Sequence, residues 1–382
     1  MDAVEQDVDI AICGGGPVGL ALAAMLAARG MPAARIALVD GKTVAQAASD
    51  PRAIAVSWGS RQLLEELRAW TAEADPIHDI HVSRRGHFGR TMIDRAEYGV
   101  PALGYVARYG ALVTALAAAV DAAGVAGLRP ARVERVDESV DGVTVHLADG
   151  RAIAAAIAVQ AEGGVFAEQV ARAQRRDYEQ TAIISHVAAS RPVPQRAFER
   201  FTDEGPLALL PHAGGYALVW CGRPATAERL MALDDAAFLV ELQAAFGERV
   251  GRFTAVGRRA AYPLGLNARP AATARTVAIG NAAQTLHPVA GQGFNLGLRD
   301  AAVLARLLAR EATPDQLQRF AAERQADRSI TVGVTDALAR VFASAPAGSL
   351  SQHALGLSLG VLDVFPAARR LLAEQMMYGQ RG

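Results

Sequence analysis

From Val8 to Gly30 the sequence reads VDIAICGGGPVGLALAAMLAARG. The first six residues are mostly apolar and predict a short buried strand. Three glycines follow at once, and an alanine- and leucine-rich helix is expected over residues 20–29, ended by Gly30. A strand, a glycine turn and a helix in this order are typical of the first unit of a nucleotide-binding α/β domain.

The glycines at positions 14, 16 and 19 have the G-x-G-x-x-G spacing of a dinucleotide-binding turn. Gly14 permits the tight turn, Gly16 lets the backbone approach a pyrophosphate, and Gly19 lets the helix pack close to the strand. Val18 stands in the same turn, where the helix N-terminus offers free N–H groups and a positive dipole end. We therefore predict a dinucleotide site here.

Two further segments extend this prediction. A strand over residues 35–39 ends in Asp40, about 20 residues after the last glycine, where the motif places a ribose-hydroxyl acceptor. Residues 276–300 read TVAIGNAAQTLHPVAGQGFNLGLRD, which predicts a buried strand, a glycine-rich loop and a helix through about Arg310. Such a loop can aim backbone N–H groups at a ring system that gains negative charge on reduction, which favours a flavin over a nicotinamide.

The composition limits the possible partners. The chain has 382 residues, of which 51% are hydrophobic and 20% charged, and its formal net charge is zero. We expect a large core in one or two domains, and no nucleic-acid binding, which would require a basic surface. Two cysteines are too few for a disulfide framework, and Cys13 is expected to be a core residue, so a cytoplasmic location is predicted. No apolar run reaches the roughly 18–20 residues of a membrane-spanning helix, which leaves peripheral membrane contact possible.

These segments, together with residues 50–57 and several stretches between residues 80 and 264, resemble the group A FAD-dependent aromatic hydroxylases. The loop that carries Asn281, Gln284 and His287 is most similar to the 2-polyprenyl-6-methoxyphenol hydroxylases of ubiquinone biosynthesis. The resemblance covers nearly the whole chain.

The resemblance implies an α/β fold, with a Rossmann-like FAD-binding domain of the GR2 type, an inserted antiparallel-sheet substrate domain and a helical C-terminus. The FAD-binding domain is expected to be discontinuous, in residues 1–75, 101–179 and 266–340. The substrate domain is expected in residues 76–100 and 180–265, and the C-terminal helical segment in residues 341–382.

The region assigned to the substrate domain has the composition of strands. Residues 207–212 and 216–220 are expected to form a hairpin around Gly214-Gly215, as part of the floor of a pocket. His78 and His81 are close in sequence, but no further ligand completes a set, so we expect no metal site.

The resemblance also implies which residues bind FAD. Arg52 would reach the pyrophosphate with its forked guanidinium, and Arg108 would face the FAD linker. Gly280 and Asn281 would contact the ribityl chain and phosphates, although most relatives have aspartate at position 281. The loop that holds the pyrimidine edge of the flavin would consist of Gly291, Gly293, Phe294 and Asn295.

The reacting centre is less well specified. Pro288 would lie beside the reacting face of the flavin. His287 is the candidate acceptor of a substrate proton, and His212 is a second polar candidate near the ring, but a structural hydrogen bond explains either histidine equally well. Glu162 stands where relatives usually have aspartate, which leaves the binding of the reductant open.

In this family NADPH or NADH reduces FAD, and O₂ then gives a C4a-hydroperoxide that hydroxylates a phenolic ring. The cofactor carries the chemistry, and the protein orients the ring and excludes water. The implied substrate is a polyprenyl phenol of ubiquinone biosynthesis, and other proteins of that route are possible partners. The C-terminal apolar residues, among them Leu355 and Leu359, would pack on the FAD domain or dock to a partner or a membrane surface.

Two alternatives remain open. One is a flavin-dependent reductase or oxidase of a lipid substrate. The other is a non-catalytic FAD-binding assembly subunit of a biosynthetic complex, which the unusual Glu162 segment would suit. No second G-x-G-x-x-G and no Cys-x-x-x-x-Cys pair occur in the sequence, which argues against the two-dinucleotide disulfide reductases.

Overall fold

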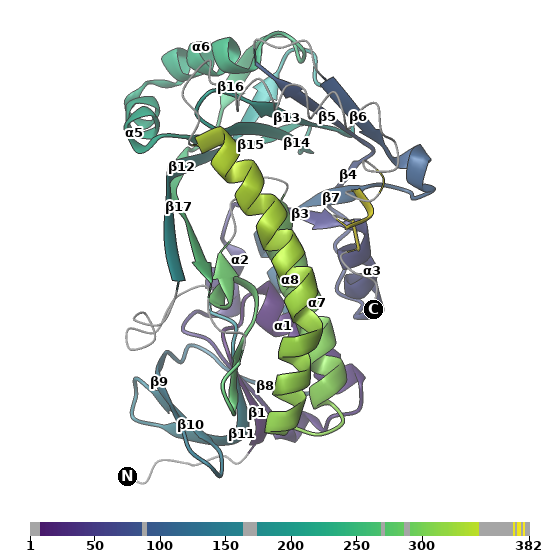
Figure 1. The fold of residues 1–382 in the computed structure, drawn as a ribbon, viewed down its shortest axis with the longest axis vertical. Coiled ribbons are helices and arrows are strands. Elements are labelled where there is room, and N and C mark those ends of the chain that lie inside the picture. The colour runs from purple at the N-terminus through teal and green to yellow at the C-terminus, as the bar shows by residue number, and fades with distance from the viewer. Residues whose placement is uncertain are drawn as a thin grey trace.

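Two large β-sheets lie at opposite ends of the computed structural model, and the longest helix, α8 (Pro314–Ala343), runs along the molecule between them (Figure 1). A small three-stranded sheet lies at intermediate height. The structure describes residues 8–85, 90–162, 174–268, 272–285 and 291–343, with residues 370, 373–375, 377 and 378 near the C-terminal end. The predicted α/β fold class is confirmed.

The first sheet is built on parallel strands, as the N-terminal strand, turn and helix predict. Their order is β8 (Ala126–Leu128), β2 (Ile36–Val39), β1 (Val8–Cys13), β11 (Ala152–Gln160) and β18 (Thr276–Ala278). An antiparallel pair, β9 (Val133–Glu138) and β10 (Val143–Leu147), extends the sheet from β11 and shares a core with one of its faces. Helices cover the other face, so β1 and β2 are almost entirely apolar.

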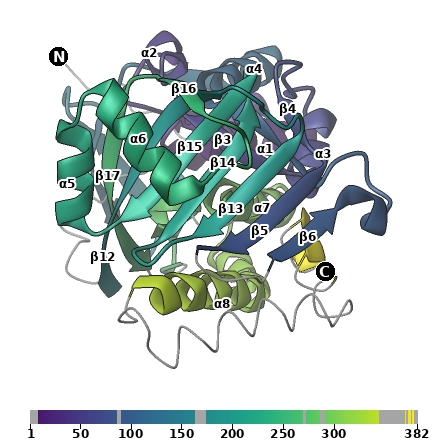
Figure 2. The same ribbon diagram turned by 90° about the horizontal axis from the view of Figure 1, so that it is seen from above.

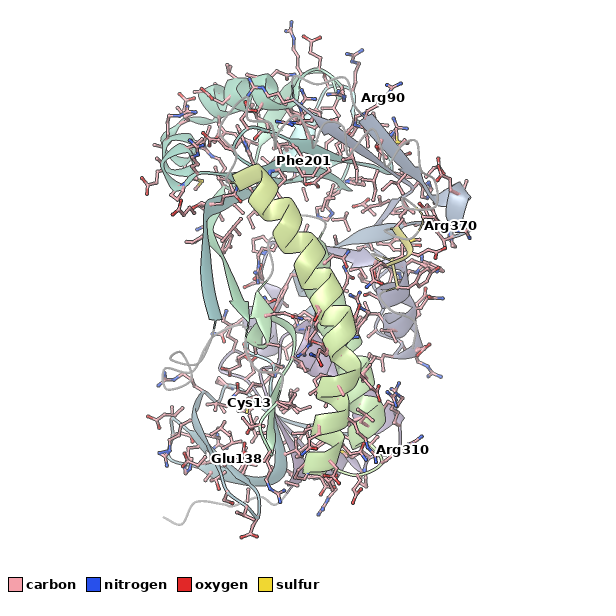
Figure 3. The ribbon with its side chains drawn as sticks, viewed as in Figure 1. Cys13, Arg90, Glu138, Phe201, Arg310 and Arg370 are labelled. Carbon is pink, nitrogen blue, oxygen red and sulfur yellow. The ribbon has the colours of Figure 1, made fainter. Side chains whose placement is uncertain are left out.

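The covering helices are α1 (Pro17–Ala28), α4 (Tyr109–Ala122) and α7 (Gln292–Leu308). Their alanine, leucine and valine side chains form one core with Ile10 and Ile12 of β1. Helix α1 begins three residues before the predicted start at residue 20, because a proline is favoured in the first helical turn. Cys13 at the end of β1 is fully buried, which confirms its prediction as a core residue (Figure 3).

The second sheet has nine strands, most of them antiparallel. In order they are β19 (Gln284–Thr285), β17 (Ala260–Ala268), β12 (Gln174–Ala189), β15 (Gly215–Gly222), β14 (Pro206–His212), β13 (Arg196–Phe201), β5 (Asp79–Arg84) and β6 (Arg90–Asp94), while β16 (Phe253–Val256) pairs with β12. The predicted hairpin is confirmed as β14 and β15. Its turn lies one residue earlier than predicted, at Ala213 and Gly214, whose φ angles are 49° and 74°.

Helices α5 (Pro224–Ala232) and α6 (Asp235–Phe246) lie across one face of this sheet (Figure 2). The prediction of strands throughout residues 180–265 is wrong for these two helices. Both carried start signals, because α5 has proline in its first turn, and the Asp234 carboxylate caps α6 by accepting from Ala237 N at 2.8 Å.

The small sheet joins β3 (Ala53–Ser57), β7 (Gly104–Arg108) and β4 (Asp75–Ile77). The remaining short elements are α2 (Val44–Ala48), α3 (Trp58–Glu66) and 3₁₀ turns at Ala33–Arg35, Arg95–Tyr98 and Gly280–Ala282. Helix α3 ends at Glu66, and Arg68 beyond it adopts a φ of 55°.

Most of the expected C-terminal segment, including Leu355 and Leu359, lies outside the described residues, and the predicted domain boundaries stay predictions. Across the part of the chain that the structure describes, no helix is both long and apolar enough to cross a membrane.

Candidate active site

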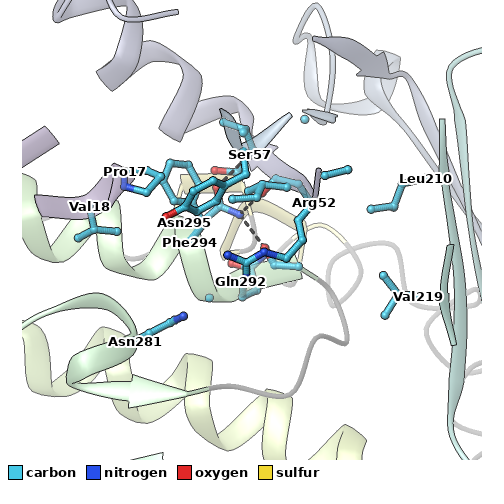
Figure 4. A pocket seen from close by; sticks show the side chains of 18 of the residues that line it. Pro17, Val18, Arg52, Ser57, Leu210, Val219, Asn281, Gln292, Phe294 and Asn295 are labelled. Atoms are coloured by element: carbon cyan, nitrogen blue, oxygen red, sulfur yellow. Dashed lines mark hydrogen bonds between the residues drawn. The ribbon is translucent and has the colours of Figure 1, made fainter. Parts of the chain in front are cut away.

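A cavity of about 950 Å³ is lined by strands of the nine-stranded and three-stranded sheets, by turns that follow strands of the first sheet, and by the start of α7. Figure 4 shows its walls. Ten of the predicted site residues line it: Gly14, Gly16, Val18, Asp40, Arg52, Asn281, Gly291, Gly293, Phe294 and Asn295. Arg108 is exposed and is not among the lining residues, while His287 and Pro288 lie outside the described residues.

The first glycine turn has the close packing that its spacing predicts. Gly14 has a φ of 117°, and its N–H donates to Val39 O at 2.8 Å. A β-carbon at Gly19 would overlap the carbonyl oxygen of Gly14 and lie 3.2 Å from Ala161 Cβ. Gly19 therefore lies behind the cavity wall, where it lets α1 approach the strand ends.

Asp40 lies at the end of β2, as predicted, and its carboxylate holds the turn. Its Oδ2 accepts from Gly15 N at 2.6 Å, and its Oδ1 accepts from Lys42 N at 2.7 Å. On the other side, Arg129 Nη2 donates to Gly15 O at 2.7 Å. Arg129 was missed by sequence reasoning because no local motif links it to a turn more than a hundred residues earlier.

The two glycine turns meet. A β-carbon at Gly280, whose φ is 58°, would lie 3.4 Å from the side chain of Val18. One at Gly297 would lie 2.9 Å from both Gly280 Cα and Val18 Cγ2. Since these glycines allow α7 to pack directly against the first turn, both turns contribute to the same cavity wall.

Two helices begin at this cavity without a side-chain cap. Gly16 is the N-cap of α1, and Gly291, with a φ of 60°, is the N-cap of α7. Neither position has a side-chain oxygen to accept the first N–H groups of its helix. Both helix ends therefore present N–H donors and positive dipole ends suited to anionic groups. This arrangement fits a dinucleotide with a negatively charged pyrophosphate and a ring that gains charge on reduction.

Asn295 connects the start of α7 to the small sheet. Its Oδ1 accepts from Ser57 N at 2.8 Å, and its Nδ2 donates to Ala55 O at 3.1 Å and to Gly291 O at 2.9 Å. The residue is 2% exposed. Because the amide already has three partners in the protein, its side chain fixes the shape of the loop around Gly291.

The variant Asn295→Asp is expected to be less stable by about 3 kcal/mol. The new oxygen would face the carbonyl oxygens of Ala55 and Gly291, and a charge would be buried beside them. Urea denaturation measures the loss. Asn281→Asp makes the same chemical change at an exposed position and should cost less than about 0.5 kcal/mol. Equal stability of the two variants would contradict the role assigned to Asn295.

Arg52 enters the cavity from the start of β3 and is held by two neighbours. Its Nε and Nη2 donate to the Asp50 carboxylate at 2.7–3.0 Å, and its guanidinium carbon lies 4.9 Å from the centre of the Tyr109 ring. Burial raises the pKa of the Tyr109 phenol, so its hydroxyl stays protonated near neutral pH. Asp50 and Tyr109 also line the cavity, and no local pattern pointed to either residue.

His212 has a partner outside the cavity. Its Nδ1 lies 3.1 Å from Asp75 Oδ2, which also accepts from Ala213 N at 2.9 Å. This contact joins β14 to the small sheet, and His212 is not among the lining residues. His212 therefore has the structural role, a hydrogen bond between two sheets, rather than a role beside the ring.

The wall opposite the glycine turns is mostly apolar and comes from the antiparallel sheet. Leu210 and Val219 point into the cavity from this sheet, across from Arg52 and Gln292 (Figure 4). The face suits an aromatic ring with an apolar substituent.

The chain matches one protein family, described as "FAD binding domain", over residues 7–331. It is 33% identical to the ubiquinone hydroxylase UbiL of Rhodospirillum rubrum, over 98% of this chain and 90% of that protein. It is 31% identical to the 3-demethoxyubiquinol 3-hydroxylase of Escherichia coli, over 85% of this chain and 87% of that protein.

Solved structures share the fold. The p-nitrophenol 4-monooxygenase PnpA of Pseudomonas putida has a TM-score of 0.77 at 16% identity, covering 99% of this chain and 100% of that one. Klebsiella pneumoniae HpxO complexed with FAD and uric acid has a TM-score of 0.75 at 16% identity, covering 98% of each chain. The predicted family and the FAD cofactor are thus confirmed: the chain belongs to the FAD-dependent hydroxylases, in the group that contains the ubiquinone hydroxylases.

Proposed function

We propose that the protein hydroxylates the ring of a polyprenyl phenol on the route to ubiquinone, with FAD as resident cofactor and NADPH or NADH as transient reductant. One observation carries the proposal: a single cavity joins two uncapped helix N-termini on one side to an apolar sheet face on the other. The names of the relatives, ubiquinone hydroxylase and 3-demethoxyubiquinol 3-hydroxylase, support the substrate class.

The residues that would hold FAD form two groups. The first turn would hold the dinucleotide half, with Arg52 on the pyrophosphate and Asp40 at the ribose. The second turn would hold the flavin half through Asn281 and the loop from Gly291 to Asn295. Bound FAD supplies the electron transfer from the nicotinamide to O₂. The roles of Arg108, His287 and Pro288 remain predictions from the resemblance.

The side chains of the cavity would orient the substrate and keep water away. The apolar sheet face would align the ring with the loop that holds the flavin. A bound ring in the right position reacts more readily than one that must first reorient. Exclusion of water protects a reactive oxygen donor from unproductive decay. The same face would take up the first isoprene units of the tail.

Glu162 makes FAD binding dependent on pH. It lines the cavity beside Gly14, and burial, with the nearby Asp40 carboxylate, raises the pKa of Glu162 to about 7. Above that pH a second negative charge faces the pyrophosphate, and below it Glu162 is neutral. We expect the apoprotein to bind FAD severalfold more tightly at pH 6 than at pH 8, as measured by quenching of flavin fluorescence. Glu162→Gln should remove the difference, and a wild-type affinity that is flat or rises with pH would contradict the assignment.

The proposal is tested with the purified protein and phenols that carry one to three isoprene units. The released cofactor should be FAD, and NAD(P)H and O₂ should be consumed in step with hydroxylated phenol. NAD(P)H oxidation without hydroxylated product would favour a flavin-dependent reductase or oxidase. Bound FAD with no phenol-stimulated oxidation would favour a non-catalytic assembly subunit.

We further propose a cytoplasmic protein that contacts the membrane surface and other proteins of the same route, because its substrate would be lipid-soluble. Flotation with phospholipid vesicles, with and without a polyprenyl phenol, tests the membrane contact. Recovery of all the protein in the vesicle-free fraction would contradict it.

A further inference from the structure

The apolar wall of the cavity contains one carboxylic acid, Glu199, among the residues that line it from β13. Glu199 pairs with Val82 on β5 and with Ala208 on β14, and both of these neighbours also line the cavity. Val219, the next residue across on β15, lines it as well. Glu199 therefore lies in a row of apolar side chains that face the substrate half of the cavity.

The alternation of side chains along β13 gives Glu199 and Arg200 different surroundings. Ala197 and Phe201 line the cavity on the same side of the strand as Glu199; Phe198 is also among the lining residues, but its ring packs against Phe246 of helix α6. The Nε of Arg200 donates to Ala245 O on α6 at 3.1 Å. Arg200 is thus engaged on the helix-covered face of the sheet. It does not neutralise its neighbour, because successive side chains of a strand point to opposite faces.

Glu199 lacks the partners that buried carboxyl groups normally have. Its Oε1 is buried and has no hydrogen-bond partner among the described residues. A buried acceptor left without a donor is costly, so an unpartnered oxygen in a native cavity calls for an explanation such as a ligand. The side chain as a whole is half-buried and lines the cavity, so a ligand hydroxyl group there would supply a donor to its carboxylate.

The groups around Glu199 leave its charge uncompensated. Burial alone raises the pKa of Glu199 to about 8. On the neighbouring strands, β5 and β14 present Val82 and Ala208, and β6 presents Thr91 opposite Val82. The titratable side chain that responds to Glu199 is Cys221 on β15, where burial and then the glutamate charge raise the pKa of the thiol, so that it stays neutral.

We propose that Glu199 binds the phenolic hydroxyl of the substrate and accepts its proton while the ring is hydroxylated. This inference rests on the proposed function. It names a proton acceptor within the described residues, where the resemblance had offered His287.

The reaction balances with reactants already named. Overall, the phenol, O₂, NAD(P)H and one proton give the hydroxylated phenol, NAD(P)⁺ and water. The substrate O–H bond breaks, its proton goes to Glu199, and the electron pair stays on the phenolate oxygen, which makes the ring a better nucleophile. The ring carbon gains its oxygen and loses its hydrogen as a proton, which ends in the water that is formed, and Glu199 then returns its own proton to the phenolate oxygen.

The acid strengths suit this transfer. An ordinary phenol has a pKa of about 10 and an ordinary glutamate about 4.3, a gap of about six units. A glutamate with a pKa of about 8 narrows that gap to about two units. A proton acceptor works best when its pKa lies near the working pH, which removes a large part of the cost of ionising the substrate.

The catalytic test compares the wild type with Glu199→Gln and Glu199→Asp. In the wild type, kcat/KM should rise with pH through about 8, as the free enzyme loses the Glu199 proton. In Glu199→Gln, kcat/KM should fall by about 10²–10⁴-fold and lose that rise, while FAD content stays unchanged. Glu199→Asp should restore part of the rate. A fluorinated phenol that is already ionised at the assay pH should suffer a much smaller loss, which a purely structural role would not produce.

A second test measures ligand binding in the absence of turnover. The wild type should bind a prenylated phenol at least about tenfold more tightly than its O-methyl ether, and Glu199→Leu, which offers no acceptor, should lose this preference. If the wild type makes hydroxylated phenol but Glu199→Gln changes kcat/KM by less than threefold with the same pH profile, the inference is overturned and the proposed function stands. If the wild type makes no hydroxylated phenol, the proposed function fails, and an absent phenol preference in the wild type overturns the binding role as well.

Discussion

Replacement of Gly19 by alanine is expected to abolish FAD binding and to destabilise the protein by about 3 kcal/mol or more, at the upper end of the overpacking range. The added methyl group would overlap the Gly14 carbonyl oxygen, and it would lie 3.1 Å from the carbonyl carbon of Gly14 and 3.2 Å from Ala161 Cβ. Two of these three atoms belong to backbone, so no rotamer change relieves the overlap. Helix α1 must move, and the turn that faces the cavity moves with it.

The measurements are urea denaturation at 25 °C and the ratio of bound flavin to protein by absorbance. Gly127→Ala is the matched control, since Gly127 lies on edge strand β8 with no atom within 4 Å of an added β-carbon. Its effect should stay within about 0.5 kcal/mol, as for ordinary surface changes. A Gly19→Ala protein with full flavin content and wild-type stability would contradict the close packing of the turn.

Asp300→Ala is expected to cost about 3–5 kcal/mol of stability. Asp300 is fully buried in α7 and accepts from Arg324 Nε at 2.7 Å and Arg328 Nη2 at 2.8 Å, both on α8. Its removal takes away the carboxylate that Arg328 contacts and leaves Arg324 only Asp327, at 2.6 Å, which Arg299 also contacts. The loss should also weaken FAD binding, because Arg328 reaches Ala278 O at 3.4 Å, just before the second glycine turn.

The matched control is Asp149→Ala, which breaks an exposed pair with Arg151 whose N–O distance is 2.7 Å. No measurable change is expected there, because water already solvates both charges. Urea denaturation measures the free energy of unfolding of both variants and of the wild type. Similar stabilities of Asp300→Ala and Asp149→Ala would show that the buried cluster contributes nothing beyond a surface pair.

The parts of the site that depend on local sequence were predicted well. The turn at Gly14 to Gly19 and, from the second glycine-rich segment, Asn281 and residues 291–295 border one cavity, because glycine spacing encodes close backbone approach. Most of the residues that the resemblance implies bind FAD line this cavity. Arg108 does not line the cavity, and it is the exposed last residue of β7.

The parts that depend on distant contacts were missed. Arg129 reaches Gly15 across 114 residues, and no spacing rule connects them. Tyr109 and Glu199 looked ordinary in sequence, because a tyrosine before an alanine-rich helix or a glutamate in a strand is usually solvated. Only the pairing of β13 with β5 and β14 shows that the glutamate lies among apolar side chains. The three backbone contacts of the Asn295 amide were not predicted either, and its predicted contact with the flavin stays a prediction.

The hydrogen bond from Ser57 N to Asn295 spans 238 residues. A nascent chain on the ribosome thus exposes its first nucleotide-binding turn long before the loop that completes the pocket has been synthesised. Contacts between residues so far apart in sequence slow folding, and the surfaces that stay exposed in the meantime are prone to aggregation. Polypeptides truncated before residue 291 would lack the loop altogether. Bound flavin would therefore show that the chain had been synthesised beyond that residue.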